Sequence, residues 1–184
     1  MPNKLNRILE RSKKIEKSIK GKNRTVTESE FHAHNRGKGK DHSHPHAKAT
    51  KLKKGFATDL EKETRKNADF RRVLYTGRFS QLVLMNLKPG EEIGEEVHDA
   101  VDQFFRFEEG EGMVIIDNVE HRVRDGSGVV IPSGARHNVL NTSSKTNLKL
   151  YTIYSPPEHQ DKVVRHTKAD ALKKPEEYDG KPTE

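Results

Sequence analysis

Four side chains in the middle of the chain have the chemical types of metal ligands. They are Glu96, His98, Gln103 and His137. Residues two apart in a β-strand share a face, so Glu96 and His98 should point to the same side. A carboxylate oxygen, an amide oxygen and two imidazoles suit a borderline divalent metal that keeps water in open positions. We therefore expect a metal site here if the segments that carry these residues line one interior.

Glycine and proline residues lie at fixed spacings before His137. The run contains Gly126, Pro132, Gly134, His137 and Asn141, spaced as G-x5-P-x-G-x2-H-x3-N. Pro132 has no N–H to give to a strand ladder, so it should stand at a strand end. Gly134 permits a tight loop that would present His137. This spacing predicts a strand, a turn and a second strand that begins near the histidine.

This run and an upstream run from Gly90 to Gly110 resemble the two signature motifs of the cupin superfamily, a small metal-binding β-barrel. The second motif matches at every marked position. The first motif, G-x5-H-x-H-x4-E-x6-G, matches in spacing and in both glycines. It departs at two ligands, since Glu96 stands where the first His is usual and Gln103 where the Glu is usual. The resemblance implies a jelly-roll barrel with a divalent ion (Zn, Mn, Fe or Ni) bound by Glu96, His98, Gln103 and His137.

Residues 87–94 and 150–159 resemble more specifically a family of small, single-domain bacterial cupins. Its members are often described as mannose-6-phosphate-isomerase-like, and the resemblance runs from about Gly55 onward. Zinc-dependent phosphomannose isomerases also combine Gln, Glu and two His, although in a different order. The resemblance further implies a possible homodimer formed through sheet packing.

The pattern after residue 70 independently predicts an all-β domain. Short apolar or alternating segments recur between turn residues, at the 8–12-residue spacing typical of a sandwich or barrel. Roughly nine short strands are expected, among them residues 71–75, 81–85, 103–107, 113–116, 120–123, 129–131, 137–140 and 148–154. Residues 60–66 are expected to form a short helical turn. Phe104, Phe105, Phe107, Tyr151 and Tyr154 should line the barrel, whereas Arg106, Glu108, His121, His159 and His166 should face solvent.

Charge divides the chain into two unlike parts. Residues 1–55 hold 16 Lys/Arg against 5 Asp/Glu, and residues 56–184 hold 19 against 23, which together give the net charge of +7. Such asymmetry indicates a basic tail on a globular domain. The expected parts are a basic, His-rich extension that is disordered or partly helical (1–54), a lead-in segment (55–69), the barrel (70–157) and a polar C-terminal tail (158–184).

The N-terminal extension contains residues that could bind two other kinds of ligand, a metal ion and a nucleic acid. Its five clustered histidines, at positions 32, 34, 42, 44 and 46, could chelate a metal, but no rigid frame would place them. Its lysines could hold nucleic acid through phosphate charge. Phe31 is its one aromatic residue, so base stacking has little support. A solvated extension with incidental histidines is the favoured interpretation.

Composition excludes other classes of chemistry and location. The chain has no cysteine, so disulfides, thiolate ligands and a thiolate nucleophile are excluded. No apolar run approaches the roughly 20 residues of a membrane span. The first 20 residues are rich in Lys and Arg and lack the apolar core of a secretory signal. We expect a cytoplasmic protein without a membrane partner.

Three functions fit these observations. The leading hypothesis is a metal-dependent enzyme on a small polar molecule, most concretely a sugar or sugar-phosphate isomerase. Glu96 and His137 are then the catalytic candidates, and Arg136 is the candidate for binding the substrate. The alternatives are an iron- or manganese-dependent dioxygenase, and a non-catalytic ligand- or metal-binding cupin with a nucleic-acid-binding basic arm. A metal-free barrel in which the polar side chains only bond one another also remains open.

Overall fold

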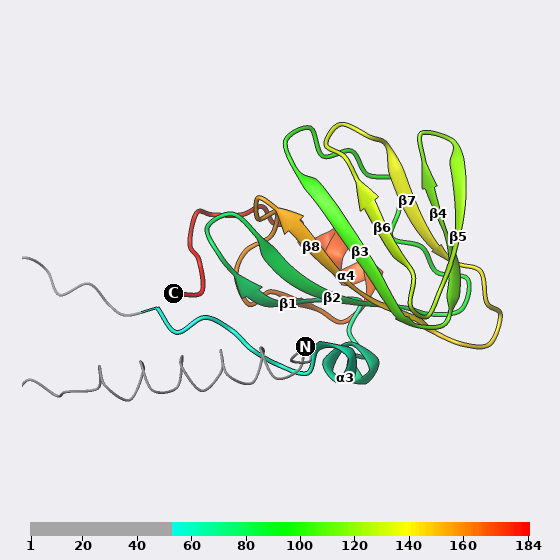
Figure 1. Ribbon diagram of the computed structural model, residues 1–184, viewed down its shortest axis with the longest axis horizontal. Helices are drawn as coiled ribbons and strands as arrows, with labels where there is room; N and C mark the ends of the chain where they lie inside the picture. Colours follow the sequence, from blue (N-terminus) through cyan, green and yellow to red (C-terminus); the bar gives the residue numbers. More distant parts are fainter. Residues whose placement is uncertain (1–52) are drawn as a thin grey trace, which may run out of the picture. The chain divides into compact units, whose positions relative to one another are not determined.

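A computed structural model describes residues 53–184 of the chain (Figure 1). The expectations for the basic, His-rich extension therefore lie outside the described residues. The elements are α3 (Leu60–Lys66), β1 (Arg71–Thr76), β2 (Gln81–Leu87), β3 (Asp102–Glu109), β4 (Glu111–Ile116), β5 (Val119–Arg124), β6 (Gly128–Ile131), β7 (His137–Asn141), β8 (Leu148–Ser155), β9 (Val164–Arg165) and α4 (Lys168–Lys173). None of the helices in this part is long and apolar enough to cross a membrane.

The strands form two antiparallel sheets, which confirms the all-β prediction. The larger sheet has the order β6-β3-β8-β2-β1-β9, and the smaller has the order β5-β4-β7. The eight strands listed from the sequence all appear, each within two residues of its expected ends. The segment of Glu96 and His98 is different, because it joins β7 through an isolated bridge rather than a continuous strand. The helix expected at residues 60–66 is α3.

Alternation along the strands divides each one into an inner and an outer face. On β3 the buried residues Gln103, Phe105 and Phe107 alternate along one face, as predicted, and Glu108 next to them is buried as well. β7 buries His137, Val139 and Asn141 in the same way. β8 contributes its own buried row, from Leu148 to Tyr154. The interior is therefore apolar along most of its length, with polar side chains at the end where β3 and β7 begin.

Gly110 joins β3 to β4 where the chain passes close to the start of β8. It has a φ of +89°, in the left-handed region that favours glycine. A Cβ at this position would overlap the carbonyl oxygen of Asn147. Both the backbone conformation and the space therefore require glycine.

Gly110→Ala should lower the free energy of unfolding by about 3 kcal/mol. The new Cβ would overlap the Asn147 carbonyl, and this cost adds to the strain of a left-handed φ in alanine. Gly126→Ala is the matched control, because Gly126 also has a positive φ, of +85°, but open space around it. We expect the control to cost about 1 kcal/mol from backbone strain alone. Urea unfolding of both variants measures the difference, and equal losses would contradict the role of the close approach.

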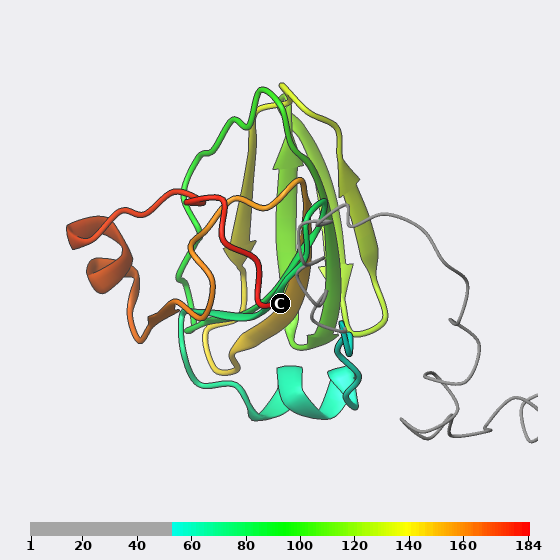
Figure 2. The same cartoon turned by 90° about the vertical axis from the view of Figure 1, so that its left-hand side faces the viewer.

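The chain after β8 is folded against the larger sheet. β9 pairs with β1, and α4 begins with a capping box formed by Thr167 and Asp170. Figure 2 shows this segment running in orange along one side of the barrel to α4, after which the red residues turn back toward the C-terminus. Asp69, just before β1, accepts hydrogen bonds from Arg72 at 2.8 Å and pairs with His166 at 2.6 Å. An ion-pair cluster thus joins the end of β9 to the start of β1.

Asp69→Asn should destabilise the protein at neutral pH and cease to do so in acid. Burial acts to raise the pKa of Asp69, but His166 and Arg72 outweigh it, so the pKa is lowered. The stabilisation is therefore present above the ordinary carboxyl pKa and is lost as pH falls through the lowered value. We expect a loss of about 1 kcal/mol at pH 7, because both partners are largely exposed to water. Unfolding of both proteins at a series of pH values from 7 downward tests this, and a loss that stays the same size through the acid range would count against the ion pairs.

Candidate metal centre

Three of the four expected ligands converge at the polar end of the barrel. One ligand atom each from Glu96, His98 and His137 lies within 4.8 Å of the others. Glu96 and His137 are joined by two backbone hydrogen bonds, of 2.9 and 3.0 Å between their N and O atoms. The bridge places the two side chains next to each other although 41 positions separate them in the sequence.

The motif turn after β6 holds the third ligand. Pro132 follows the last residue of β6, and Gly134 has a φ of +80°. The N–H of Gly134 donates to the carbonyl of His98 at 2.9 Å. Proline and glycine thus perform the turn role that their spacing predicts, and the turn fixes the backbone of His98.

The His137 ring has a buried oxygen opposite each nitrogen. Nδ1 lies 3.0 Å from the carbonyl oxygen of Ala135, and Nε2 lies 3.0 Å from Oε1 of Gln103. The Gln103 amide is oriented by its own N–H, which donates to Thr152 at 3.1 Å. A neutral imidazole carries only one N–H, and in the tautomer that donates from Nδ1 to Ala135 the Nε2 lone pair faces the amide oxygen. A cation coordinated by both Nε2 and Oε1 would satisfy both atoms, and Oε1 of Gln103 lies next to the cluster of Glu96, His98 and His137.

The spacing of the remaining ligand atoms also fits an ion. Oε2 of Glu96 lies 3.5 Å from Nε2 of His98 and 4.0 Å from Nε2 of His137. Neighbouring ligands of a tetrahedral zinc, with bonds of about 2.0–2.2 Å, are about 3.3–3.6 Å apart. Nε2 of His98 is buried and has no hydrogen-bond partner among residues 53–184. A buried imidazole nitrogen without a hydrogen-bond partner, beside a carboxylate, is an arrangement that a divalent metal would complete once the nitrogen has lost its proton.

Two carboxylates, those of Glu96 and Glu158, stabilise a positively charged His98 ring when no metal is bound. The carboxylates of Glu158 and Glu96 raise the pKa of His98 to about 9, against the effect of burial. Burial acts to raise the pKa of Glu96, but His98, Arg71 and His137 outweigh it and the pKa is lowered. At neutral pH the metal-free site is therefore an imidazolium between carboxylates, and a metal ion must displace the His98 proton.

In the metal-free protein, the His98 ring should titrate near pH 9 instead of near 6.5. Its raised pKa means that the associated stability is fully present below about pH 6.5 and is lost as pH rises through about 9. NMR titration of the histidine rings measures this, and His98→Asn assigns the signal by removing it. A His98 signal that titrates at or below pH 6.5 would contradict the carboxylate pairing.

The structure corrects two predictions of solvent exposure. His159 is 6% exposed and packs edge-on against Tyr154, with ring centroids 5.1 Å apart. Burial is the main cause that lowers its pKa to about 2, so its ring is neutral. Glu108 is also buried, and its carboxylate lies 3.4 Å from Arg106. His121 and His166 are exposed, as expected.

Two residues near the site were missed in the sequence. Glu158 lies beside His98, and Arg71 of β1 reaches within 3.9 Å of the Glu96 carboxylate. Arg71 lies outside both motifs. Glu158 lies within residues 150–159, which resemble the small bacterial cupins, but that resemblance gave it no role, because its position beside His98 depends on how the C-terminal segment packs. Arg136, the candidate for substrate binding, has a side chain that is 63% exposed and hydrogen-bonds Glu95 at 3.3 Å. Its substrate role stays a prediction.

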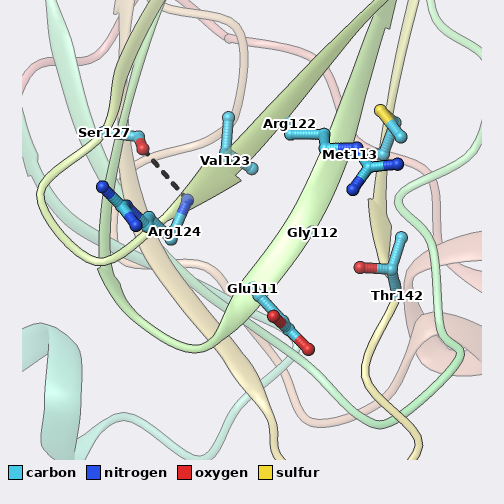
Figure 3. Close-up of a pocket in the computed structure, with 8 residues that line it drawn as sticks. All are labelled: Glu111, Gly112, Met113, Arg122, Val123, Arg124, Ser127 and Thr142. Carbon is cyan, nitrogen blue, oxygen red and sulfur yellow. Dashed lines mark hydrogen bonds between the residues drawn. The ribbon is translucent and has the colours of Figure 1, made fainter.

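A surface groove of about 640 Å³ lies on the smaller sheet, and Figure 3 shows the residues that line it. It is lined by Glu111, Gly112, Met113, Arg122, Val123, Arg124, Ser127 and Thr142. None of the four expected ligands takes part in it. The candidate metal site is therefore identified by the spacing of its ligand atoms and not by the presence of a large groove.

Comparisons with known proteins concern the same part of the chain. Residues 83–154 match the protein family described as the cupin domain. The uncharacterized protein YrkC of Bacillus subtilis is 45% identical over 125 residues, covering 65% of this chain and 67% of YrkC. The uncharacterized protein L612 of Acanthamoeba polyphaga mimivirus is 41% identical over 107 residues, covering 56% and 67%. The crystal structure of BH2720 from Bacillus halodurans is similar with a TM-score of 0.64 and 43% identity, covering 66% of this chain and 96% of that one.

Proposed function

The chain belongs to the cupin superfamily, and from this we propose that it binds one divalent metal ion in order to act on a small polar molecule. The ligands are Glu96, His98, Gln103 and His137. The observation that carries the proposal is the convergence of three ligand atoms within 4.8 Å, one of them a buried nitrogen with no other partner in the described part of the chain.

The donor set suits the ion chemically. One anionic oxygen, one amide oxygen and two imidazole nitrogens match zinc, manganese, iron or nickel. The lowered pKa of Glu96 keeps this carboxylate ionised at neutral pH, so it offsets part of the charge of a divalent ion. The Arg71 guanidinium lies 3.9 Å from the Glu96 carboxylate, where its positive charge partly offsets the negative charge of the carboxylate and helps to hold it in place.

The geometry supports ligand roles for both catalytic candidates. His137 has its Nδ1 against the Ala135 carbonyl, so only Nε2 is available and it faces the ligand cluster. Glu96 is a weak base because its pKa is lowered. Lewis-acid polarisation of a substrate carbonyl or hydroxyl is the chemistry that a bound divalent ion would supply there.

Isomerisation of a sugar or sugar phosphate is the concrete form of this proposal. It is supported by the kinds of ligand, one Gln, one Glu and two His, and by the resemblance to isomerase-like cupins described above. Arg136, exposed beside the segment that carries Glu96, is the candidate for binding a phosphate group. Polarising a carbonyl acidifies the neighbouring C–H, which is the first requirement of aldose–ketose exchange.

Full-length, tag-free protein should contain about one more metal ion per chain than its His98→Ala, His137→Ala variant. Elemental analysis of both proteins measures the difference. The histidines of the N-terminal extension are present in both proteins, so they cancel. A His121→Ala, His166→Ala variant controls for the loss of two histidines, because both residues are exposed. Equal metal content in the parent and the His98/His137 variant would overturn the barrel site.

The same proteins test the reaction. The metal-loaded parent should interconvert an aldose phosphate and a ketose phosphate, lose this activity with a chelator and regain it with the metal. The His98/His137 variant should be at least about 100-fold less active. Two of the four proposed ligands are lost, and the loss of a single outer partner of a ligand already costs about 10- to 100-fold. Metal binding without any isomerisation over a panel of sugars and sugar phosphates would remove the isomerase assignment and leave the metal site standing.

A further inference from the structure

The C-terminal segment, residues 156–184, supplies a carboxylate to the outer side of a candidate metal ligand. Oε1 of Glu158 lies 3.4 Å from Nδ1 of His98, while Nε2 on the other side of that ring faces Glu96 at 3.5 Å. The His98 ring is thus bracketed by two carboxylates. Only one of them, that of Glu96, also faces His137 and the rest of the ligand cluster.

We propose that Glu158 is the positioning residue of the metal site: it accepts the Nδ1–H of His98 and thereby turns the Nε2 lone pair toward the ion. This inference rests on the proposed function, since it assigns a role relative to the metal. A histidine ligand is fixed in tautomer and orientation by the hydrogen bond of its other nitrogen. A carboxylate in that position also makes the imidazole a stronger donor.

Glu158 can serve as a fixed partner because a buried side chain holds its backbone. Gln81 on β2 is 1% exposed. Its Oε1 accepts from the N–H of His159 at 2.9 Å and from that of Glu158 at 3.3 Å. Its Nε2 donates to the carbonyl of His159 at 2.7 Å. This clamp ties the segment to the larger sheet at the point where it passes the metal ligands.

Later residues of the same segment hold Glu158 from the other side. The N–H of Tyr178 donates to the Glu158 carbonyl at 2.9 Å. His159 is buried against Tyr154, whose own ring meets His98 edge-on with centroids 5.8 Å apart. The backbone around Glu158 is therefore held by hydrogen bonds on both sides, with its carboxylate directed at His98.

The two histidine ligands then have different outer partners. His137 has the main-chain carbonyl of Ala135 at 3.0 Å, and His98 has the Glu158 side chain. Since each ring has one nitrogen against an outer acceptor, both present Nε2 to the centre. Glu158 completes at His98 what the barrel backbone already provides at His137.

Glu158→Gln tests this role with little change of shape. Cobalt(II) alone is the probe, because its visible absorption reports both affinity and ligand geometry. The signal of the His98→Ala, His137→Ala variant is subtracted to remove binding by the N-terminal histidines. We expect the dissociation constant to rise by about 10- to 100-fold and the spectrum of the bound ion to change. Glu158→Asp, which keeps the charge, should recover part of the affinity.

Glu177→Gln is the matched control, because Glu177 is exposed on the same segment. It should bind cobalt(II) as the parent does. Thermal unfolding of the metal-free proteins separates a general loss of stability from a loss of ion affinity. Affinity of Glu158→Gln within about twofold of the parent, or an equal loss in Glu177→Gln, would overturn the positioning role while leaving the metal site intact. A parent protein that binds no cobalt(II) above the background would overturn the proposed function and the role of Glu158 together.

Discussion

The candidate site depends on hydrogen bonds between an irregular segment and β7. Glu96 and His137 exchange both of their backbone hydrogen bonds. Further back, the N–H of Ile93 donates to Val139 and the N–H of Asn141 donates to Glu91, each at 2.9 Å. The segment therefore follows β7 without forming a regular strand. This pairing brings a carboxylate and an imidazole from distant parts of the sequence to the same end of the barrel, where Gln103 and His98 join them.

Two asparagines of β7, Asn138 and the motif residue Asn141, maintain this arrangement without being metal ligands themselves. The Asn141 amide donates to the carbonyls of Leu87, Lys88 and Thr146, which ties the end of β2 to the β7–β8 loop at the far end of β7. Asn138 bonds Glu92 at 2.8 Å and accepts from the N–H of Gly94. The segment before Glu96 is thus held by side chains as well as by backbone. Buried polar groups are stable when their partners are fixed, so these contacts define one position for the ligands.

Much of the barrel and the ligand cluster could be predicted because both leave local signals. Alternation on β3 and β7 places Gln103 with Phe105, and His137 with Val139, on inner faces. Turn residues mark the strand ends. The C-terminal segment leaves no comparable signal, because its contacts are polar and join residues far apart, as Glu158 and His98 are. The polar composition of residues 158–184, taken by itself, predicts that their side chains are exposed to solvent. His159 is buried because this segment docks against β1 and β2.

The unequal outer partners of the two histidines have an evolutionary consequence. The oxygen opposite His137 belongs to the main chain, so no substitution at Ala135 can delete it. The oxygen opposite His98 belongs to a side chain outside the barrel strands, and one codon change at position 158 would alter it. If the C-terminal carboxylate acts as proposed, descendants of this protein can retune how tightly they hold an ion, or relinquish it, while the strands and their core stay untouched.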